Sequence, residues 1–276
     1  MNLELLTNKS KDNVEQLLTC LSIGNDTTDR IRNILIKAKN LYIIKDAEAK
    51  FGFVNFKYDA VKKVAYCPIH FNKDLSNIEI DEVVKRVMML SRENNSDYIV
   101  LMDMFNKIDW GKYYRYNEPW DCFLSMRMEE YETIKEIIPQ SEVTFRIDNL
   151  NYNDLLDLHK KSYQSEPVYV IGEWAQLLEQ FLTNQDYMIV SCRLNDKLIG
   201  ACIGYPYVDK HYIYSVCILP EHRGKQIGYK MLNYYLTHCE SKVYHLHVLQ
   251  SNTIACKLYE QLGFKNISKD NLVYKT

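Results

Sequence analysis

The chain has 276 residues, which is enough for two ordinary domains or one large domain. Apolar residues make up 47% and charged residues 25%, a balance that is typical of globular proteins and excludes an intrinsically disordered chain. The formal net charge of −2 gives no electrostatic support to a nucleic-acid partner, and no run of Lys and Arg indicates a local basic patch.

Signals for secretion, membrane insertion and metal binding are missing from the sequence. The first residues lack the basic start and apolar run of a signal peptide, and no apolar stretch is long enough to span a bilayer. The eight cysteines are scattered without a Cys-x-x-Cys pair, and several lie in apolar runs. We therefore expect reduced, buried thiols, a cytoplasmic location, no membrane partner and no metal site.

The spacing of apolar residues predicts helices and strands in the first half of the chain. The expected helices are 12–21, 28–39 and 80–91. The expected strands are 41–44, 51–58, 64–71, 98–104 and 122–128. We expect the last of these strands to close the sheet of this half.

The polar, proline-containing segment 138–142 predicts a boundary between domains at 1–140 and 141–276. The strands expected after it are 143–147, 187–193, 198–206, 212–219, 243–249 and a short one around 272–274. The helices expected after it are 151–162, 171–184, one that follows the strand at 212–219, and 253–262. Both halves show the same order of elements, which indicates a diverged tandem repeat, although a shared order also arises without duplication.

The stretch 212–236 combines a strand, a sharp turn and an amphipathic helix. The strand at 212–219 is apolar enough to be covered on both faces, and Pro220 ends it because proline has no backbone donor. Residues 223–228 form the turn, and apolar residues recur at helical spacing beyond it. A glycine-containing loop that leads into a helix N-terminus exposes unpaired N–H groups, which predicts a binding site for a pyrophosphate.

This loop resembles the pyrophosphate loop of the Gcn5-related N-acetyltransferases, the GNAT family. Arg223 and Gly228 match the first and last positions of the family's Gln/Arg-x-x-Gly-x-Gly/Ala motif. Gln226 replaces the middle glycine, while the neighbouring Gly224 keeps the loop open. The resemblance covers residues 143–276, about half of the chain.

A second motif follows in the order that the family requires. Asn252, Ala255, Tyr259, Gly263 and Phe264 match the family's Asn-x-x-Ala-x-x-x-Tyr…Gly-Phe pattern. The resemblance implies an α+β fold with three α/β layers. It also implies two acetyltransferase-like domains, each a mixed, mainly antiparallel sheet flanked by helices.

The resemblance also implies acetyl-CoA as the co-substrate and names the groups that contact it. Backbone groups of Val216, Cys217 and Ile218 are expected to pair with the pantetheine arm. The residues expected to hold the pyrophosphate are Arg223, Gly224, Lys225, Gln226, Ile227, Gly228 and Tyr229. Asn252 is expected to cap the helix that it precedes and to touch CoA.

The first half keeps the order of elements but not the loop. Its counterpart of the loop, 72–81, has no glycine and several carboxylates, and both features oppose a pyrophosphate. We expect a degenerate acetyltransferase-like domain that shapes the acceptor pocket or supports the fold.

Acetyl transfer to an amine needs a base for the amine, an N–H donor for the oxyanion and a proton for the leaving thiolate. Tyr259 is the candidate acid; the alternative is a core tyrosine, in a chain with 22 of them. His247 is the candidate base, because it stands where peptide amino-terminal acetyltransferases of the family carry a glutamate and because histidine titrates near neutrality. Its alternative is a strand histidine hydrogen-bonded in the core, like its neighbour His245.

Further candidates are weaker. Glu173 lies where the family often faces the acceptor, but an acid in the first turn of a helix is also favoured by the helix dipole. Glu166, Asp209 and His211 are candidates of the same kind. Cys217 and Cys256 flank the site without a histidine partner in sequence, so we interpret them as packing residues.

The sequence therefore predicts an acetyl-CoA-dependent N-acetyltransferase that moves an acetyl group directly onto an amine of a small molecule or peptide. One alternative is a non-catalytic acyl-CoA-binding or regulatory module. A phosphate- or nucleotide-binding module is a second alternative, and it leaves the motif from Asn252 to Tyr259 unexplained.

Overall fold

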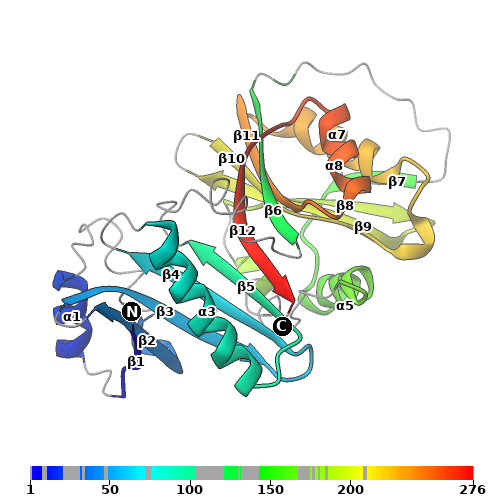
Figure 1. Ribbon diagram of the computed structural model, residues 1–276. Coiled ribbons are helices and arrows are strands. Elements are labelled where there is room, and N and C mark those ends of the chain that lie inside the picture. The colour runs from blue at the N-terminus through cyan, green and yellow to red at the C-terminus, as the bar shows by residue number, and fades with distance from the viewer. Residues whose placement is uncertain are drawn as a thin grey trace. The chain divides into compact units, whose positions relative to one another are not determined.

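The structure is a computed structural model, shown in Figure 1. The residues it describes are 2–7, 11–20, 32, 35–46, 49–71, 76–103, 121–129, 131, 143–166, 175, 178–179, 181–183, 186–207 and 210–275. The chain forms two compact units. Unit 1 comprises Met1–Phe123 and Lys269–Thr276, and unit 2 comprises Leu124–Ser268.

Unit 1 is a mixed, mainly antiparallel sheet with helices. Its elements are β1 (Asn2–Leu5), α1 (Lys11–Cys20), β2 (Asn40–Asp46), β3 (Ala49–Asp59), β4 (Val64–Phe71), α3 (Asn77–Glu93) and β5 (Tyr98–Asp103). The strand order is β1-β2-β3-β4-β5 followed by β12 (Lys265–Lys275), and β4 and β5 are the parallel neighbours. Leu17 and Leu18 of α1 pack on Leu41, Ile43 and Phe53 of the sheet, so burial of this apolar helix face holds the helix in place.

Unit 2 repeats this plan. Its elements are β6 (Asp121–Glu129), β7 (Val143–Ile147), α5 (Tyr152–Tyr163), β8 (Met188–Leu194), β9 (Lys197–Tyr207), β10 (Lys210–Ile218), α7 (Ile227–His238), β11 (Val243–Leu249) and α8 (Thr253–Gln261). Unit 2 ends within β12, at Ser268. The strand order is β6-β11-β10-β9-β8-β7. β10 and β11 are parallel, while β7 to β10 form an antiparallel meander.

Helices cover both faces of the unit 2 sheet. On one face, Leu155 and Leu158 of α5 form a core with Ala201, Ile203 and Cys217. On the other face, α7 packs over β9 and β10 (Figure 1). Its Tyr235 lies against Gly204 of β9 and His211 of β10. The three-layer α+β architecture and the tandem arrangement predicted from the sequence are thereby confirmed.

The final strands of the two halves are exchanged. Strand 122–128 was expected to close the sheet of the first half, but β6 lies beside β11, and its residues from Leu124 onward belong to unit 2. The C-terminal strand instead pairs with β5 of unit 1 in antiparallel register, from Leu272 opposite Leu101 to Lys275 opposite Tyr98. The expectation about sheet closure was wrong because the choice of neighbour is made by long-range pairing and not by the pattern within either strand.

Several expectations fall on residues that the structure does not describe. The predicted boundary at 138–142 lies outside the described residues, as do half of the helix expected at 28–39 and much of that expected at 171–184. In the part of the chain that is described, no helix is both long and apolar enough to cross a membrane. Seven cysteines are described as free thiols, and six of them are buried, as predicted.

Candidate active site

A bulge in β10 changes which side chains face each side of the sheet. The register of β10 against β9 shifts between Ile213, which lies opposite Gly204, and Ser215, which lies opposite Ile203. The extra residue, Tyr214, breaks the alternation, so Ser215 and Cys217 face α5 while Ile213 faces α7. A bulge of this kind bends the strand and re-aims the groups that follow it.

Beyond the bulge, β10 and β11 no longer pair. Their parallel ladder runs over three pairs, from His211 with Tyr244 to Ile213 with Leu246. β10 continues to Ile218 and β11 to Leu249, and this whole stretch is described, so the two strands diverge over their C-terminal ends. The backbone groups along this divergence therefore have no partner on β11.

Alternation of the backbone identifies the groups that line the divergence. The N–H of Leu219 donates to the Ile199 carbonyl on β9 at 2.9 Å. Because successive residues of a strand direct their backbone groups to opposite sides, Val216 and Ile218 direct theirs away from β9, toward the divergence. The expectation that this segment is covered on both faces was wrong for Tyr212, Tyr214 and Val216, which are only half-buried.

Two side chains already occupy the carbonyls on this edge. The Tyr163 hydroxyl donates to the Val216 carbonyl at 3.0 Å. The Arg223 Nε donates to the Ile218 carbonyl at 3.0 Å, and its Nη2 donates to the Ser162 carbonyl. Arg223 therefore ties the loop to both β10 and the end of α5, a role that the loop motif does not reveal.

The loop after β10 ends at a helix N-terminus that has no cap. Gln226 takes a left-handed conformation (φ 58°) and makes no side-chain cap bond, and the first turn of α7 contains no acidic residue. The first hydrogen bond of the helix runs from Lys230 N–H to the Gln226 carbonyl at 3.0 Å. The N–H groups of Ile227, Gly228 and Tyr229 are thus left for a ligand, and the helix dipole favours an anion there.

The glycines and Gln226 have distinct roles in this loop. Gly224 has a φ of +76°, and a Cβ added there would meet nothing within 4 Å, so its backbone is open to an approaching ligand. A Cβ on Gly228 would lie 3.2 Å from Leu258 Cδ1, so this glycine lets α7 and α8 pack closely. Gln226 holds a left-handed backbone that glycine adopts without strain, at a cost of about 1 kcal/mol.

Tyr259 lies on α8, and Asn252 positions the start of that helix. The Asn252 side chain accepts a hydrogen bond from Ala255 N–H at 3.2 Å, which confirms the predicted cap. Tyr259 is 8% exposed, and its ring packs edge-on against Phe264. Burial raises the pKa of the Tyr259 phenol well above its usual range, with Cys202 as the next contribution, so the phenol keeps its proton at neutral pH.

His247 is the first residue of β11 beyond the last pair with β10. It is half-buried, and its Nδ1 shares a hydrogen bond with the Tyr212 hydroxyl at 2.6 Å. Its ring meets that of His245 edge-on. His245 is buried and hydrogen-bonded to Ser125, as expected for a strand histidine in the core.

The remaining candidates differ in what the structure places around them. Glu173 and Asp209 lie outside the described residues, and Glu166 lies just beyond the end of α5. His211 is buried against Tyr235 at 2.6 Å, and burial lowers its pKa to about 4, so it is a neutral packing residue. Burial raises the pKa of the Cys217 thiol to about 12, and Cys256 is also buried. Among the described residues, no group of His, Cys, Asp and Glu could hold a metal ion.

Residues on α5 complete the site, and sequence reasoning missed them. His159 is fully buried, and its Nε2 lies 2.8 Å from Ser215 Oγ in the bulge. Tyr163 lies one turn later and reaches Val216. A histidine and a tyrosine four residues apart share one face of a helix, and this spacing was the signal that the sequence offered.

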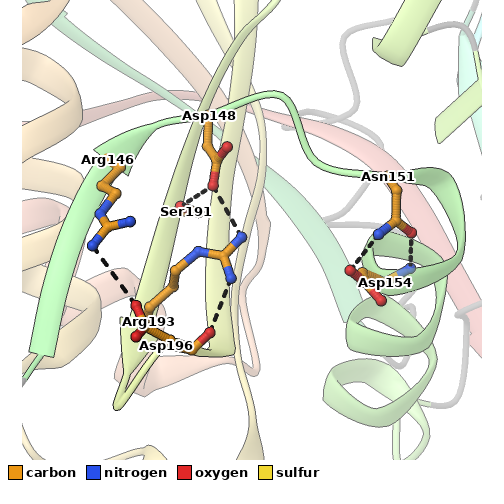
Figure 2. Close-up of polar contacts among 7 residues, drawn as sticks. All are labelled: Arg146, Asp148, Asn151, Asp154, Ser191, Arg193 and Asp196. Atoms are coloured by element: carbon orange, nitrogen blue, oxygen red, sulfur yellow. Dashed lines mark hydrogen bonds and ion pairs between the residues drawn. The ribbon is translucent and has the colours of Figure 1, made fainter.

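A polar network holds the segment that leads into α5. The Asp148 carboxylate accepts hydrogen bonds from Ser191 Oγ at 2.9 Å and from Arg193 Nη2 at 3.0 Å (Figure 2). Asn151 then caps α5 by accepting a hydrogen bond from Asp154 N–H at 2.9 Å (Figure 2). Desolvation raises the pKa of Asp148, but the hydrogen bonds from Ser191 and Arg193 outweigh it and leave the pKa below its usual value.

Comparison with known proteins relates part of this chain to a described family. Residues 150–264 match the model of the acetyltransferase (GNAT) family, and no curated protein matches the sequence. A similar solved structure is a tandem GNAT protein from the clavulanic acid biosynthesis pathway, with 11% identity, 99% of this chain and 98% of that chain covered, and a TM-score of 0.63.

Two further structures show the same likeness. A GCN5-related N-acetyltransferase from Sphaerobacter thermophilus has 11% identity, coverage of 94% and 89%, and a TM-score of 0.60. An acetyltransferase from the GNAT family of Colwellia psychrerythraea has 10% identity, coverage of 100% of both chains, and a TM-score of 0.54. At such identities the likeness concerns the fold.

Proposed function

Residues 150–264 form a GNAT-family domain within a chain that has the tandem GNAT fold, and from this premise we propose an acetyl-CoA-dependent N-acetyltransferase. Its active site lies in unit 2. The acetyl group moves directly from the thioester to an amine of a small molecule or peptide, without an acyl-enzyme.

The observation that carries the proposal is the divergence of β10 and β11 beside an uncapped helix. The ladder between the strands stops at Ile213 and Leu246, and the N-terminus of α7 presents amides with no acidic side chain in its first turn. An extended pantetheine arm fits the unpaired strand edge, because its amides can bond to backbone groups there. The pyrophosphate fits the helix N-terminus.

In the proposed reaction, His247, the Val216 N–H and Tyr259 act one after another. The amine nitrogen attacks the thioester carbon while His247 takes the amine proton. The N–H of Val216 meets the carbonyl oxygen as negative charge develops on it. The C–S bond then breaks, and the Tyr259 phenol, which burial keeps protonated, donates its proton to the CoA thiolate.

Consumption of acetyl-CoA tests the proposal directly. We expect the protein to release CoA thiol when it is offered a panel of amino acids, polyamines, aminoglycosides and peptide amino termini. Calorimetry with CoA alone runs in parallel and measures binding. Binding without turnover on any amine would support a non-catalytic acyl-CoA module instead, and competition by ATP at the same site would support a nucleotide-binding module.

A further inference from the structure

The last two turns of α5 form a hydrogen-bonded contact with the bulge of β10. His159 Nε2 lies 2.8 Å from Ser215 Oγ, and the Tyr163 hydroxyl lies 3.4 Å from the same oxygen and 3.0 Å from the Val216 carbonyl. The two rings contact each other with centroids 5.7 Å apart. These contacts join α5 to the bulge, where the register of β10 against β9 shifts.

The direction of each hydrogen bond on the His159 side follows from its partners. His159 Nδ1 lies 3.0 Å from the Leu155 carbonyl, which can only accept, so Nδ1 carries the proton. Burial lowers the pKa of His159 to about 4, so the ring is neutral and its Nε2 is an acceptor. The Ser215 hydroxyl therefore donates to His159, and this bond holds the bulge against α5.

The direction is also fixed on the Tyr163 side. A backbone carbonyl can only accept, so the Tyr163 hydroxyl donates to Val216. The Val216 carbonyl is then engaged, and its N–H is the group that points into the divergence of β10 and β11. An acceptor oxygen is attracted to this N–H, whereas an unengaged carbonyl beside it would repel that oxygen.

We propose that Tyr163 is a positioning residue for acyl transfer, which leaves the Val216 N–H as the donor that meets the acyl oxygen. This inference rests on the proposed acetyltransferase function. Tyr163 touches neither substrate nor the reacting atoms; it acts through the backbone of Val216. The bond between His159 and Ser215 holds the same backbone one residue before Val216.

Tyr163→Phe separates this role from a packing role, because it keeps the ring against His159 and removes only the hydroxyl. We expect kcat to fall about tenfold, less than when an oxyanion donor itself is removed, while KM for acetyl-CoA changes little. Tyr152→Phe is the matched control, since Tyr152 starts the same helix and packs at the edge of the same core. Its kcat should equal that of the wild type.

A spectroscopic measurement reports the hydrogen bond itself. Acetyl-CoA labelled with carbon-13 at the carbonyl is bound without an acceptor, and its carbonyl stretch is recorded by infrared spectroscopy. We expect a downshift on binding to the wild type and to Tyr152→Phe, and a smaller one in Tyr163→Phe. Ser215→Ala removes the hydroxyl that donates to His159 but leaves the Tyr163 side chain in place. It should also reduce the downshift, and it serves if Tyr163→Phe does not fold.

The outcomes separate this inference from the proposed function. A wild-type protein that neither binds CoA nor shifts the carbonyl stretch would overturn both. A wild type that binds and turns over, with the same kcat and the same downshift in Tyr163→Phe, would overturn the role of Tyr163 alone. Equal losses in Tyr163→Phe and Tyr152→Phe would likewise overturn it, because they would indicate a general effect on α5.

Discussion

The parallel strand pairs of the two units differ at the point where a ligand would enter. In unit 1, β4 and β5 stay paired over six residues, from Val64 with Tyr98 to Ile69 with Asp103. In unit 2, β10 and β11 separate after three pairs. The register of β4 against β3 is constant, whereas that of β10 against β9 shifts at a bulge. A bulge and a short ladder therefore distinguish the diverging pair β10–β11 from the fully paired strands β4 and β5.

The helices that follow β4 and β10 differ in how their N-termini are capped. Ser76 and Glu79 form a capping box at the start of α3, in which Glu79 accepts from Ser76 N–H at 2.8 Å. The start of α7 has no side-chain cap and no acid in its first turn. Unit 1 satisfies its helix N-terminus with its own carboxylate, while unit 2 leaves the amides for an external anion.

The differences between the two units show that the candidate site consists of local departures from the most stable geometry. A missing cap costs about 1 kcal/mol, and Gln226 in the left-handed region costs about as much again. The start of α3 in unit 1 avoids both costs, because Ser76 caps the helix with a φ of −67°. We infer that unit 1 is the degenerate half expected from the sequence.

Removal of the proposed acid should have the largest effect. Tyr259→Phe keeps the buried ring and its contact with Phe264 but removes the proton donor. We expect kcat to fall about 100-fold with little change in the affinity for acetyl-CoA, measured by steady-state kinetics and calorimetry. An unchanged kcat would assign Tyr259 to the core. Tyr235→Phe is no suitable control, because its hydroxyl is bonded to His211, so Tyr152→Phe serves again.

The proposed base should have the next largest effect. In His247→Gln we expect kcat to fall about tenfold at neutral pH, because the amide side chain cannot take the amine proton. His238→Gln is the control, since His238 is exposed at the end of α7. An unchanged kcat in His247→Gln would exclude His247 as the base.

Copying the acid of unit 1 into unit 2 should close the anion site. Tyr229 is the third residue of α7, as Glu79 is the third residue of α3. Tyr229→Glu should weaken CoA binding about tenfold through charge repulsion at the helix N-terminus, and the loss should shrink as salt is added. Tyr229→Gln controls for the loss of the ring. Equal affinity of the Glu and Gln variants would show that the amides of α7 do not hold the pyrophosphate.

The reverse change in unit 1 should cost stability without creating a site. Ser76→Ala combined with Glu79→Ala removes the capping box, so we expect the free energy of unfolding to fall by about 1 kcal/mol in a urea titration. CoA affinity should stay at the wild-type value because β4 and β5 remain paired. Glu82→Ala, on the exposed side of the same helix, is the control. A second CoA equivalent bound by the double variant would mean that the cap alone had closed unit 1.

The sequence predicted the elements of unit 2 well where the signal is local. The strand at 143–147, the strand at 243–249 and the cap at Asn252 are as expected, because apolar alternation and capping depend on a few adjacent residues. The bulge at Tyr214 was not predictable in this way. No glycine or proline marks it, and it is held by His159 and Tyr163 from a helix some 50 residues earlier in the chain.

The exchange of final strands escaped prediction for the same reason. The sequences of β6 and β12 both predict ordinary strands. Only pairing with distant parts of the chain assigns Leu124 onward to unit 2 and Lys269 onward to unit 1. Features that depend on a few adjacent residues, such as the cap at Asn252, were therefore predicted from the sequence. Those that depend on tertiary contacts, such as Tyr163, were not.

The smallest expected effect tests how firmly unit 2 anchors the helix that holds its bulge. Asp148→Asn keeps the shape of the side chain but removes its charge from Ser191 and Arg193 (Figure 2). Because the folded-state pKa of Asp148 lies below its usual value, its stabilisation is present above about pH 4 and is lost as pH falls through the folded-state pKa. We expect the wild type to exceed Asp148→Asn by about 1 kcal/mol in urea at pH 7 and by less at pH 3.

Asp196→Asn is the matched control for this last change. Its carboxylate is 88% exposed and lies 3.8 Å from Arg146, a surface pair that contributes little (Figure 2). A difference for Asp148→Asn that does not vary between pH 3 and pH 7 would contradict the role of its charge. If the anchor matters to the site, kcat of Asp148→Asn should also fall slightly while that of Asp196→Asn does not, because α5 carries Tyr163 to the Val216 carbonyl.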